Sequence, residues 1–472
     1  MRSAALIVLI VFAASCGAPS KPPSKAEGNT AGRAPGLAAG IEGEIRLITL
    51  DPGHFHASLV QKTAVPGVSP VVQVYAPEGP ELRDHLARIR AFNNRANDPT
   101  RWEERVTTGP DFLERMVRER KGKVVVIAGN NARKTLYIKA AVDAGLNVLA
   151  DKPMAVTAED FDLLREAFAA AERNGVLLYD IMTERSEITT VLQRELIAVP
   201  ALFGAFEQGT VEDPAVVKAS VHHFFKVVAG SPLVRPPWFF DTSQQGEGIV
   251  DVTTHLVDLV QWECFPGEVI DGASDIVLER ARRSTTPVTR DQFRKATGLA
   301  DFPNFLKKGV QGETLLVSCN GQIDYSLRGL HARVSVAWNF EPPEGGGDTH
   351  FSVIRGTKAD VVIRQEAEQK FKPEIYVEPA KGGSLADVGA ELKRAMPFLQ
   401  RKYPGLKLAE EPGRWHVLIP DAYRVGHEAH FGQVAERFLQ YLKDGRLPAW
   451  EVPGMLAKYR LTTQALALAL GK

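Results

Sequence analysis

The sequence predicts an α/β domain followed by an α+β domain, and two patterns carry this prediction. Strand-like and helix-like runs alternate from residue 45 to residue 182. Beyond residue 183, β-branched runs follow one another with only short turns between them. The alternation indicates a parallel sheet with right-handed helical crossovers, and the successive runs indicate a largely antiparallel sheet.

The first domain is expected to contain strands and helices whose ends are marked by turn residues. Its strands are expected at 45–50, 71–75, 123–131, 147–151 and 176–182, and its helices at 55–63, 110–119, 133–144 and 158–174. The run 123–131 begins as a continuous apolar stretch, as a strand covered on both faces must be. Residues 82–105 are polar and Arg-rich.

The second domain is expected to be less regular. Its helices are predicted at 186–196, 248–264 and 428–442, and its strands at 203–210, 220–228, 314–319, 322–327, 332–340, 350–355 and 359–364. Residues 370–425 form an irregular insertion with an amphipathic helix near 385–403, and a tail is expected to follow the last helix.

Charge and composition narrow the class of protein. The 472 residues contain 57 Lys and Arg against 57 Asp and Glu, and 44% of the residues are hydrophobic. Such a chain can bury a sizeable core in two domains. Because the charges balance and form no long run of one sign, nucleic acid is not an expected partner.

The N-terminus has the pattern of an export signal. Arg2 precedes an apolar run, Ala4–Ala14, which is too short to span a bilayer. Ser15 and Cys16 follow and resemble the lipid-attachment motif of bacterial lipoproteins. We expect residues 1–15 to be a signal peptide and residues 16–44 a lipid-anchored flexible linker, on the periplasmic or cell-surface side of a bacterial membrane. An ordinary cleaved signal peptide is the alternative.

Two cysteines remain in the folded part, Cys264 and Cys319. They could pair in an oxidising compartment, or they could stay as buried thiols. We favour buried thiols, because Cys264 ends an apolar helical pattern and Cys319 lies in a strand-like run.

Two motifs carry the functional prediction. The first is LNVLADKPMAVTAEDF, in which Asp151, Lys152 and Pro153 follow a strand. The second is QGEGIVDVTTHLVDLVQW, in which Asp251 and His255 are four residues apart on a predicted apolar helix. Buried carboxylate and imidazole groups are costly unless they are paired or used. Together the motifs resemble those of the Gfo/Idh/MocA oxidoreductases, with Asp151 in place of the usual Glu.

The resemblance implies a Rossmann-type NAD(P)-binding domain at 45–182 and an α+β catalytic domain at 183–472. It also implies catalytic roles. Lys152, aimed inward by a cis bond to Pro153, lies beside the nicotinamide and stabilises charge on the reacting oxygen. His255 is the general base and acid, and Asp251 orients it and contacts the substrate.

The predicted nucleotide-binding turn, LDPGHFHAS, departs from the family's GxGxxG pattern. Gly53 takes the middle glycine position, whereas Asp51 and His56 replace the first and third. The helix N-terminus is kept as an anion site, and a histidine of the turn can donate to phosphate. The expected cofactor-binding residues are Gly53, His54, Phe55, His56, Glu78, Asn130, Asn131, Asp151 and Lys152. Glu78 can hold the adenosine ribose, so NAD is favoured and NADP stays possible.

Weaker patterns suggest substrate contacts and argue against a metal. Arg185, His222, Lys226, Trp238 and Asp258 are candidate substrate-facing residues. His427 and His430 have ligand-like spacing, but no third ligand is suggested, and a surface helix is the better interpretation. No metal site is expected.

The resemblance implies hydride transfer between a nicotinamide cofactor and a hydroxyl of a sugar, cyclitol or glycoside. Since soluble cofactor is scarce outside the cytoplasm, we expect a tightly bound, self-recycled cofactor. One alternative is a glycoside hydrolase or lyase that works through transient oxidation or without redox chemistry. Another is a carbohydrate-binding lipoprotein on a retired enzyme scaffold. A homo-oligomer is possible.

Overall fold

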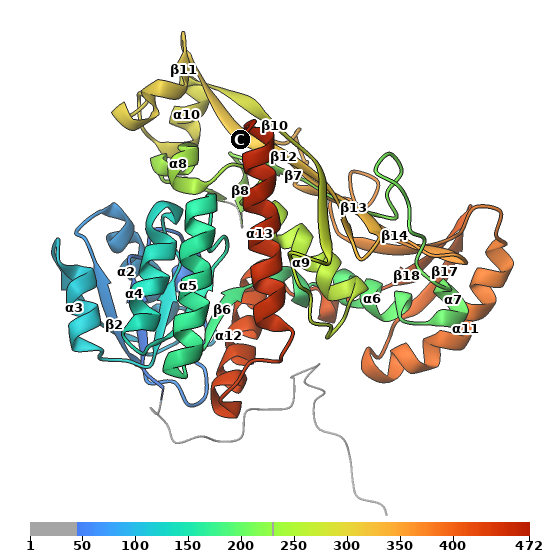
Figure 1. Cartoon of the computed structure of the whole chain (residues 1–472), viewed down its shortest axis with the longest axis horizontal. Helices are drawn as coiled ribbons and strands as arrows, with labels where there is room; N and C mark the ends of the chain where they lie inside the picture. The colour runs from blue at the N-terminus through green and yellow to red at the C-terminus, as the bar shows by residue number, and fades with distance from the viewer. Residues whose placement is uncertain (1–44, 229–230) are drawn as a thin grey trace, which may run out of the picture. The chain divides into compact units, whose positions relative to one another are not determined.

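A computed structural model describes residues 45–228 and 231–472. The predicted signal peptide, linker and Cys16 lie outside the described residues. The predicted fold class is confirmed: a parallel six-stranded sheet is followed by a mostly antiparallel ten-stranded sheet (Figure 1).

The first sheet has the strand order β3-β2-β1-β4-β5-β6, and all its pairs are parallel. Its strands are β1 (Leu47–Leu50), β2 (Val71–Ala76), β3 (Glu103–Thr108), β4 (Val124–Ile127), β5 (Asn147–Asp151) and β6 (Leu178–Ile181). β1, β4 and β6 are buried along their whole length, as expected for strands covered on both faces. The carboxyl ends of β1, β2, β4 and β5 therefore meet at one edge.

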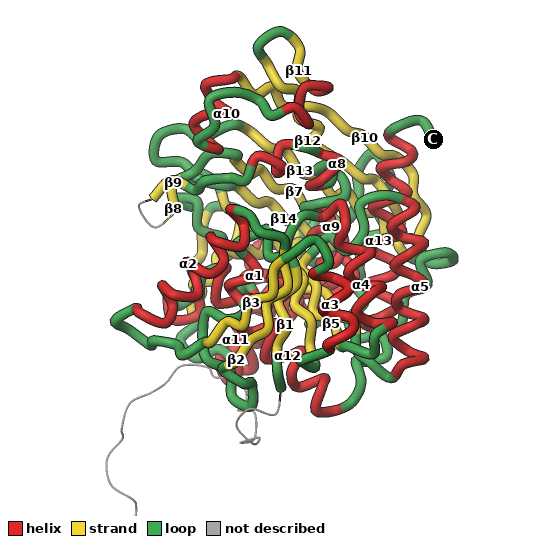
Figure 2. Tube along the Cα trace, turned by 90° about the vertical axis from the view of Figure 1, so that its left-hand side faces the viewer, coloured by secondary structure: helices red, strands yellow, loops and turns green. Residues whose placement is uncertain are grey.

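Helices cover both faces of this sheet (Figure 2). One layer contains α3 (Phe112–Glu119), α4 (Lys134–Asp143) and α5 (Ala158–Asn174), and the other contains α1 (His56–Leu59) and α2 (Pro80–Asn94). The bounds of α5 match the prediction, and its ends show why. Thr157 and Asp160 form a capping box at the start, and Gly175 ends the helix with a φ of 63°.

The second sheet has the order β10-β12-β13-β7-β14-β15-β16-β18-β17, with β11 paired to β12. Its strands are β7 (Val216–His223), β10 (Ile276–Thr289), β11 (Val310–Gln311), β12 (Thr314–Leu327), β13 (Leu330–Asn339), β14 (Thr349–Arg355), β15 (Ala359–Gln365), β16 (Glu374–Pro379), β17 (Lys407–Glu411) and β18 (Arg414–Leu418). Burial alternates along β13, so one face of this strand packs inward.

One face of this sheet packs on α6 (Ile188–Ile197), α9 (Thr253–Cys264) and α11 (Leu385–Lys402). The remaining elements are short, apart from two C-terminal helices, α12 (His427–Asp444) and α13 (Glu451–Ala469). The short ones are α7 (Pro200–Phe203), α8 (Thr242–Gln245), α10 (Arg290–Thr297), β8 (Val227–Val228), β9 (Ser231–Pro232), and 3-10 turns at Asn131–Arg133, Thr183–Ser186, Pro237–Phe240, Asn304–Gly309 and Asp421–Tyr423.

Several sequence-based boundaries were wrong. The helix predicted at 55–63 is the single turn α1, and residues 203–210 contribute isolated bridges where a strand was expected. The predicted insertion 370–425 is regular, since β16, β17 and β18 extend the large sheet. β3 and β10 were missed because their exposed, charged residues obscure the strand pattern.

The C-terminal helices complete the core of the first half. The supposed C-terminal tail is the 19-residue helix α13, which contacts α5, α9 and β10 (Figure 1). Phe438 of α12 and Met455 and Tyr459 of α13 belong to the same buried cluster as the strands of the parallel sheet. Ala457 and Leu461 of α13 belong to the separate cluster of the second sheet. Both helices were assigned to the catalytic domain, but α12 packs on the first half of the fold and α13 packs on both halves.

A buried network of charges joins the halves. Lys458 of α13 places its Nζ 2.7 Å from Asp180 Oδ2 of β6 and 2.7 Å from Asp258 Oδ1 of α9. Arg185 donates to both oxygens of Asp258, at 2.6 and 2.7 Å, and also to Glu451. All five side chains are almost fully buried. Buried charges of this kind are tolerated only when each has partners.

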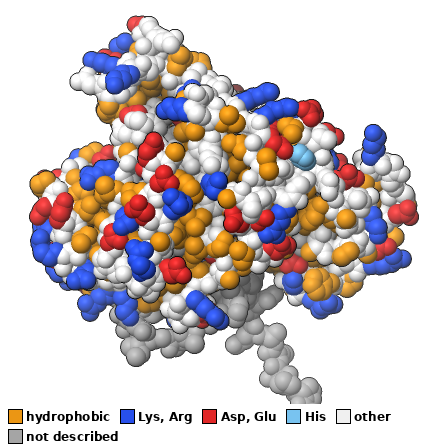
Figure 3. Space-filling model, viewed as in Figure 1, with side chains coloured by type: hydrophobic (Ala, Val, Ile, Leu, Met, Phe, Trp, Pro, Cys, Tyr) orange, Lys and Arg blue, Asp and Glu red, His pale blue; other side chains and the backbone are white. Residues whose placement is uncertain are grey.

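Surface charge and thiols agree with the sequence. On the face shown in Figure 3, acidic and basic side chains are interspersed, consistent with the balanced composition. Cys264 and Cys319 are buried free thiols, as predicted. Among the helices of residues 45–228 and 231–472, none is long and apolar enough to cross a membrane.

Replacing the central cation of the network tests its contribution. Lys458→Met removes the ammonium group and leaves Asp180 and Asp258 buried with fewer partners. We expect the free energy of unfolding to fall by about 3–5 kcal/mol, measured by urea denaturation. The control Arg165→Met breaks an exposed ion pair with Asp162 and should cost less than about 1 kcal/mol. Equal losses of unfolding free energy in the two variants would contradict the stabilising role given to the buried network.

Candidate active site

An ion pair between the two sheets forms the centre of the site. Lys152 follows β5, and its Nζ lies 2.6 Å from Oδ1 of Asp251, which precedes α9. The second oxygen of Asp251 accepts a hydrogen bond from Gln245 at 3.0 Å. The Lys152–Pro153 peptide bond is cis, as the sequence predicted. The structure thus brings together two residues that are 99 positions apart in the chain.

A close approach of two backbones positions Asp251. Gly248 lies against β12, where a Cβ atom on residue 248 would sit 1.8 Å from the carbonyl oxygen of Cys319. Only glycine allows this contact. Gly248, the second glycine of the motif, therefore lets the segment before α9 pack directly on the sheet and present Asp251 to Lys152.

His255 lies on the first turns of α9, and its Nδ1 has no hydrogen-bond partner among the described residues. Burial, followed by the positive charge of Lys152, lowers the pKa of His255 to about 4. Among the other nearby groups, Glu184 and Asp258 raise this pKa and His427 lowers it. At neutral pH His255 is therefore uncharged and able to accept a proton.

The altered nucleotide-binding turn keeps the shape that the family pattern requires. Asp51 adopts a φ of 47°, the left-handed conformation usual for glycine, which Asp tolerates better than most residues. Its carboxylate accepts a hydrogen bond from Tyr137 at 2.8 Å, which fixes the direction of the side chain. A Cβ on Gly53 would lie 3.2 Å from the backbone nitrogen of Asn130, which shows how closely these backbones approach.

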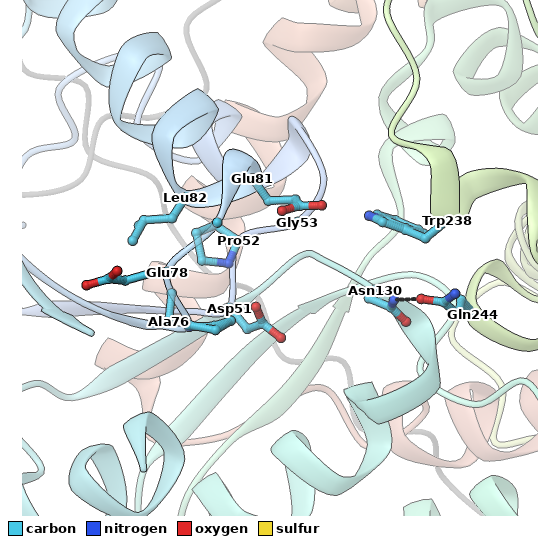
Figure 4. Close-up of a pocket in the computed structure, with 12 residues that line it drawn as sticks. Asp51, Pro52, Gly53, Ala76, Glu78, Glu81, Leu82, Asn130, Trp238 and Gln244 are labelled. Carbon is cyan, nitrogen blue, oxygen red and sulfur yellow. Dashed lines mark hydrogen bonds between the residues drawn. The ribbon is translucent and has the colours of Figure 1, made fainter. Parts of the chain in front are cut away.

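A pocket opens beside this turn (Figure 4). Its walls come from the ends of β1, β2 and β4 on one side and from the second half of the fold on the other, and they include Asp51, Pro52, Gly53, Ala76, Pro77, Glu78, Gly79, Glu81, Leu82, Asn130, Trp238 and Gln244. In Figure 4 Trp238 and Gln244 face the turn from across the pocket. The glycine cradle and the acidic side chains at the end of β2 fit the diphosphate and the ribose hydroxyls of a dinucleotide.

The histidines of the turn contact Asp151 and each other, whereas from the sequence we expected them to donate to a phosphate. His56 Nδ1 lies 2.8 Å from Asp151 Oδ2, and both side chains are buried. The His54 ring packs edge-to-face against His56, and Phe55 lies between them in the chain. Since α1 is one turn long, its dipole adds little to anion binding.

The loop after β4 contacts the second half of the fold. Asn130 donates to the Gln244 side chain at 2.6 Å, and Asn131 donates to the Gln245 carbonyl at 2.6 Å. α8 therefore lies between the nucleotide pocket and Asp251. Gln244 and Gln245 were missed from the sequence, although a polar pair directly before the glycine-led motif was an available signal.

The weaker substrate candidates have other partners. Arg185 and Asp258, expected to face a substrate, are buried in the ion network and bind each other. Lys226 and His222 lie 2.6 and 3.5 Å from Asp348. Trp238, in contrast, lines the pocket. Sequence patterns could not reveal these pairings because each partner comes from a distant segment.

A small aromatic hollow lies on the other side of α8. Phe224, Phe239 and Trp338 line it together with Gln245 and Asp251. Next to it, the Arg235 guanidinium lies 4.5 Å from the centre of the Phe239 ring and donates to the backbone carbonyls of His223 and Phe224. An aromatic wall next to a carboxylate is a surface on which a polar ligand with an apolar face can pack.

Family models match both halves of the chain. Residues 57–180 match "Oxidoreductase family, NAD-binding Rossmann fold", and residues 192–470 match "Putative oxidoreductase C terminal domain". The chain belongs to the Gfo/Idh/MocA oxidoreductases. It is therefore an oxidoreductase-family protein with an NAD-binding Rossmann domain, as the two motifs predicted.

Solved structures agree with this assignment. A crystal structure described as a putative oxidoreductase from Parabacteroides merdae is 56% identical, covers 91% of this chain and 98% of its own, and has a TM-score of 0.89. GenD2 from gentamicin A biosynthesis, in complex with NAD, is 16% identical over 93% and 98% of the two chains, with a TM-score of 0.55. Levoglucosan dehydrogenase with NADH and levoglucosan is 15% identical over 90% and 97%, with a TM-score of 0.56. No curated protein matches the chain significantly.

Proposed function

We propose that this oxidoreductase transfers hydride between bound NAD and a carbinol carbon of a sugar, cyclitol or glycoside. The observation that carries the proposal is the 2.6 Å contact of Lys152 with Asp251, next to an uncharged His255 and beside the nucleotide pocket. A cation, a carboxylate and a neutral imidazole are the groups needed to move a proton from a hydroxyl.

The residues act in a simple sequence when a hydroxyl is oxidised. His255 accepts the hydroxyl proton, while the Lys152 ammonium stabilises the negative charge that develops on the oxygen. Asp251 holds Lys152 and fixes its direction. Bound NAD supplies the acceptor for the hydride that leaves the carbon. In the reverse direction His255 returns the proton to the oxygen.

Variants of these residues test the mechanism. Lys152→Ala and His255→Ala should each lower turnover by at least about 100-fold, measured as hydride transfer with a panel of sugars and glycosides. The thermal midpoint should stay near that of the unaltered protein. His331→Ala, a histidine paired with Glu279 on the far sheet, is the matched control and should keep full activity. Unaltered rates in either active-site variant would remove the catalytic assignment.

We propose that the site prefers NAD to NADP. Glu78, which follows β2, and Glu81, in the first turn of α2, line the pocket where the adenosine ribose is expected. Carboxylates accept hydrogen bonds from ribose hydroxyls, whereas they repel a 2′-phosphate.

Cofactor discrimination can be measured directly by titration. NAD should bind at least about 10-fold more tightly than NADP, and the double variant Glu78→Gln/Glu81→Gln should narrow this ratio. Glu114→Gln, on α3 away from the pocket, is the control. A preference for NADP in the unaltered protein would contradict the role given to these carboxylates.

We further propose that the protein is exported and lipid-anchored at Cys16, and that it holds its cofactor tightly enough to recycle it within each turnover. Support comes from the signal-like N-terminal sequence, because freely exchanging cofactor is scarce outside the cytoplasm. A cycle of oxidation and reduction on one bound cofactor avoids that shortage.

Mass spectrometry of small molecules released by denaturing the chain, purified without added cofactor, tests retention. We expect close to one equivalent of NAD per chain. Turnover that needs stoichiometric added cofactor would reject recycling, and an empty protein that also fails to bind NAD or NADP would favour the non-redox or binding alternatives.

A further inference from the structure

We propose that His54, His56 and Asp151 form a binding site for a divalent transition-metal ion between the carboxyl ends of β1 and β5. Two histidines come from the turn after β1, and the aspartate is the last residue of β5. No metal site was expected from the sequence, because Asp151 is 95 residues from His56 and the pair His427 and His430 offered the more visible spacing.

The donor atoms are arranged as a ligand set. The three atoms lie within 4.8 Å of one another. His56 Nδ1 is 2.8 Å and His54 Nδ1 is 4.0 Å from Asp151 Oδ2. Two donors that share an ion at about 2.1 Å lie about 3.0–3.4 Å apart, so small rotations of the side chains suffice to bring all three to one ion. The centres of the two imidazole rings are 4.0 Å apart, so both histidines lie beside the carboxylate.

Metal binding must replace two hydrogen bonds of these histidines. His56 Nδ1 donates to Asp151 Oδ2 at 2.8 Å, and His54 Nδ1 accepts from the backbone nitrogen of His56 at 3.4 Å. An ion that takes their place requires His56 Nδ1 to give up its proton, so binding should release one proton to solvent.

The two lysine side chains near Asp151 bind other groups. Lys134 donates to the backbone carbonyls of Asp151 and Lys152, and Lys152 is paired with Asp251. These contacts leave the Asp151 carboxylate oriented toward the histidines. The remaining cationic field weakens metal binding, so we expect a moderate affinity and an ion of the Zn²⁺ or Co²⁺ type, for which imidazole is a good ligand.

The site also has an entry path and open coordination positions. His427 of α12 has its ring centroid 5.5 Å from that of His56, and its side chain is 44% exposed. An ion can enter past this residue. Because these residues supply three donors, at least one coordination position is left for water or another oxygen ligand. The site rests on its own geometry and does not depend on the proposed reaction.

Titration with Co²⁺ and Zn²⁺ tests the site. The full chain, stripped with a chelator, should bind one equivalent of either ion, seen as d–d absorption for Co²⁺ and by calorimetry for Zn²⁺. His56→Ala should weaken binding by about 100-fold or more. Asp151→Asn keeps the shape of the side chain but removes its charge, and it should weaken binding to a similar extent.

His331→Ala is again the matched control, since the His331–Glu279 pair has the same histidine–carboxylate contact, at 3.1 Å, without a second histidine. Thermal midpoints establish that each variant is folded. The proposal is overturned if the unaltered chain binds neither ion stoichiometrically, or if binding is undiminished in both His56→Ala and Asp151→Asn.

Discussion

The arrangement of the site depends on the ion pairs that the Lys458 ammonium group forms with Asp180 and Asp258. This ammonium group lies between a carboxylate of the last parallel strand and a carboxylate of α9, the helix that carries His255. Since neither Asp180 nor Asp258 can be solvated, the two elements are held at a fixed separation. The Lys152–Asp251 pair forms across the same junction. The distance between these two residues therefore depends on the buried ion pairs of Lys458, which have no catalytic role themselves.

Much of the fold and the catalytic centre could be predicted from local sequence. The strand ending at Asp151 and the helix Ala158–Asn174 were placed to the residue, because buried strands and capped helices leave strong local patterns. The features that could not be predicted are those that depend on residues far away in the chain. α13 carries Lys458 and Glu451 on faces that look exposed in the sequence but are neutralised by residues far away in the chain.

The nucleotide turn shows how a family pattern can change while its geometry persists. Asp51 takes the backbone conformation of the missing glycine, and its carboxylate accepts a hydrogen bond from Tyr137. His56, at the third glycine position, turns its side chain to Asp151. Both replacements could be recognised in the sequence as departures from the pattern. Their partners, Tyr137 on α4 and Asp151 at the end of β5, could not be predicted because they lie far away in the chain.

The return of α12 and α13 to the first half has a consequence for the order of synthesis. Phe438 and Tyr459 help to fill the core around the parallel strands, yet they leave the ribosome roughly four hundred residues after the first of these strands, which ends at Leu50. Until then this half carries an uncovered apolar surface. A fragment that ends at Met182, the predicted boundary of the first domain, should therefore not fold stably on its own, and the nucleotide-binding half becomes complete only when translation of the whole chain has finished.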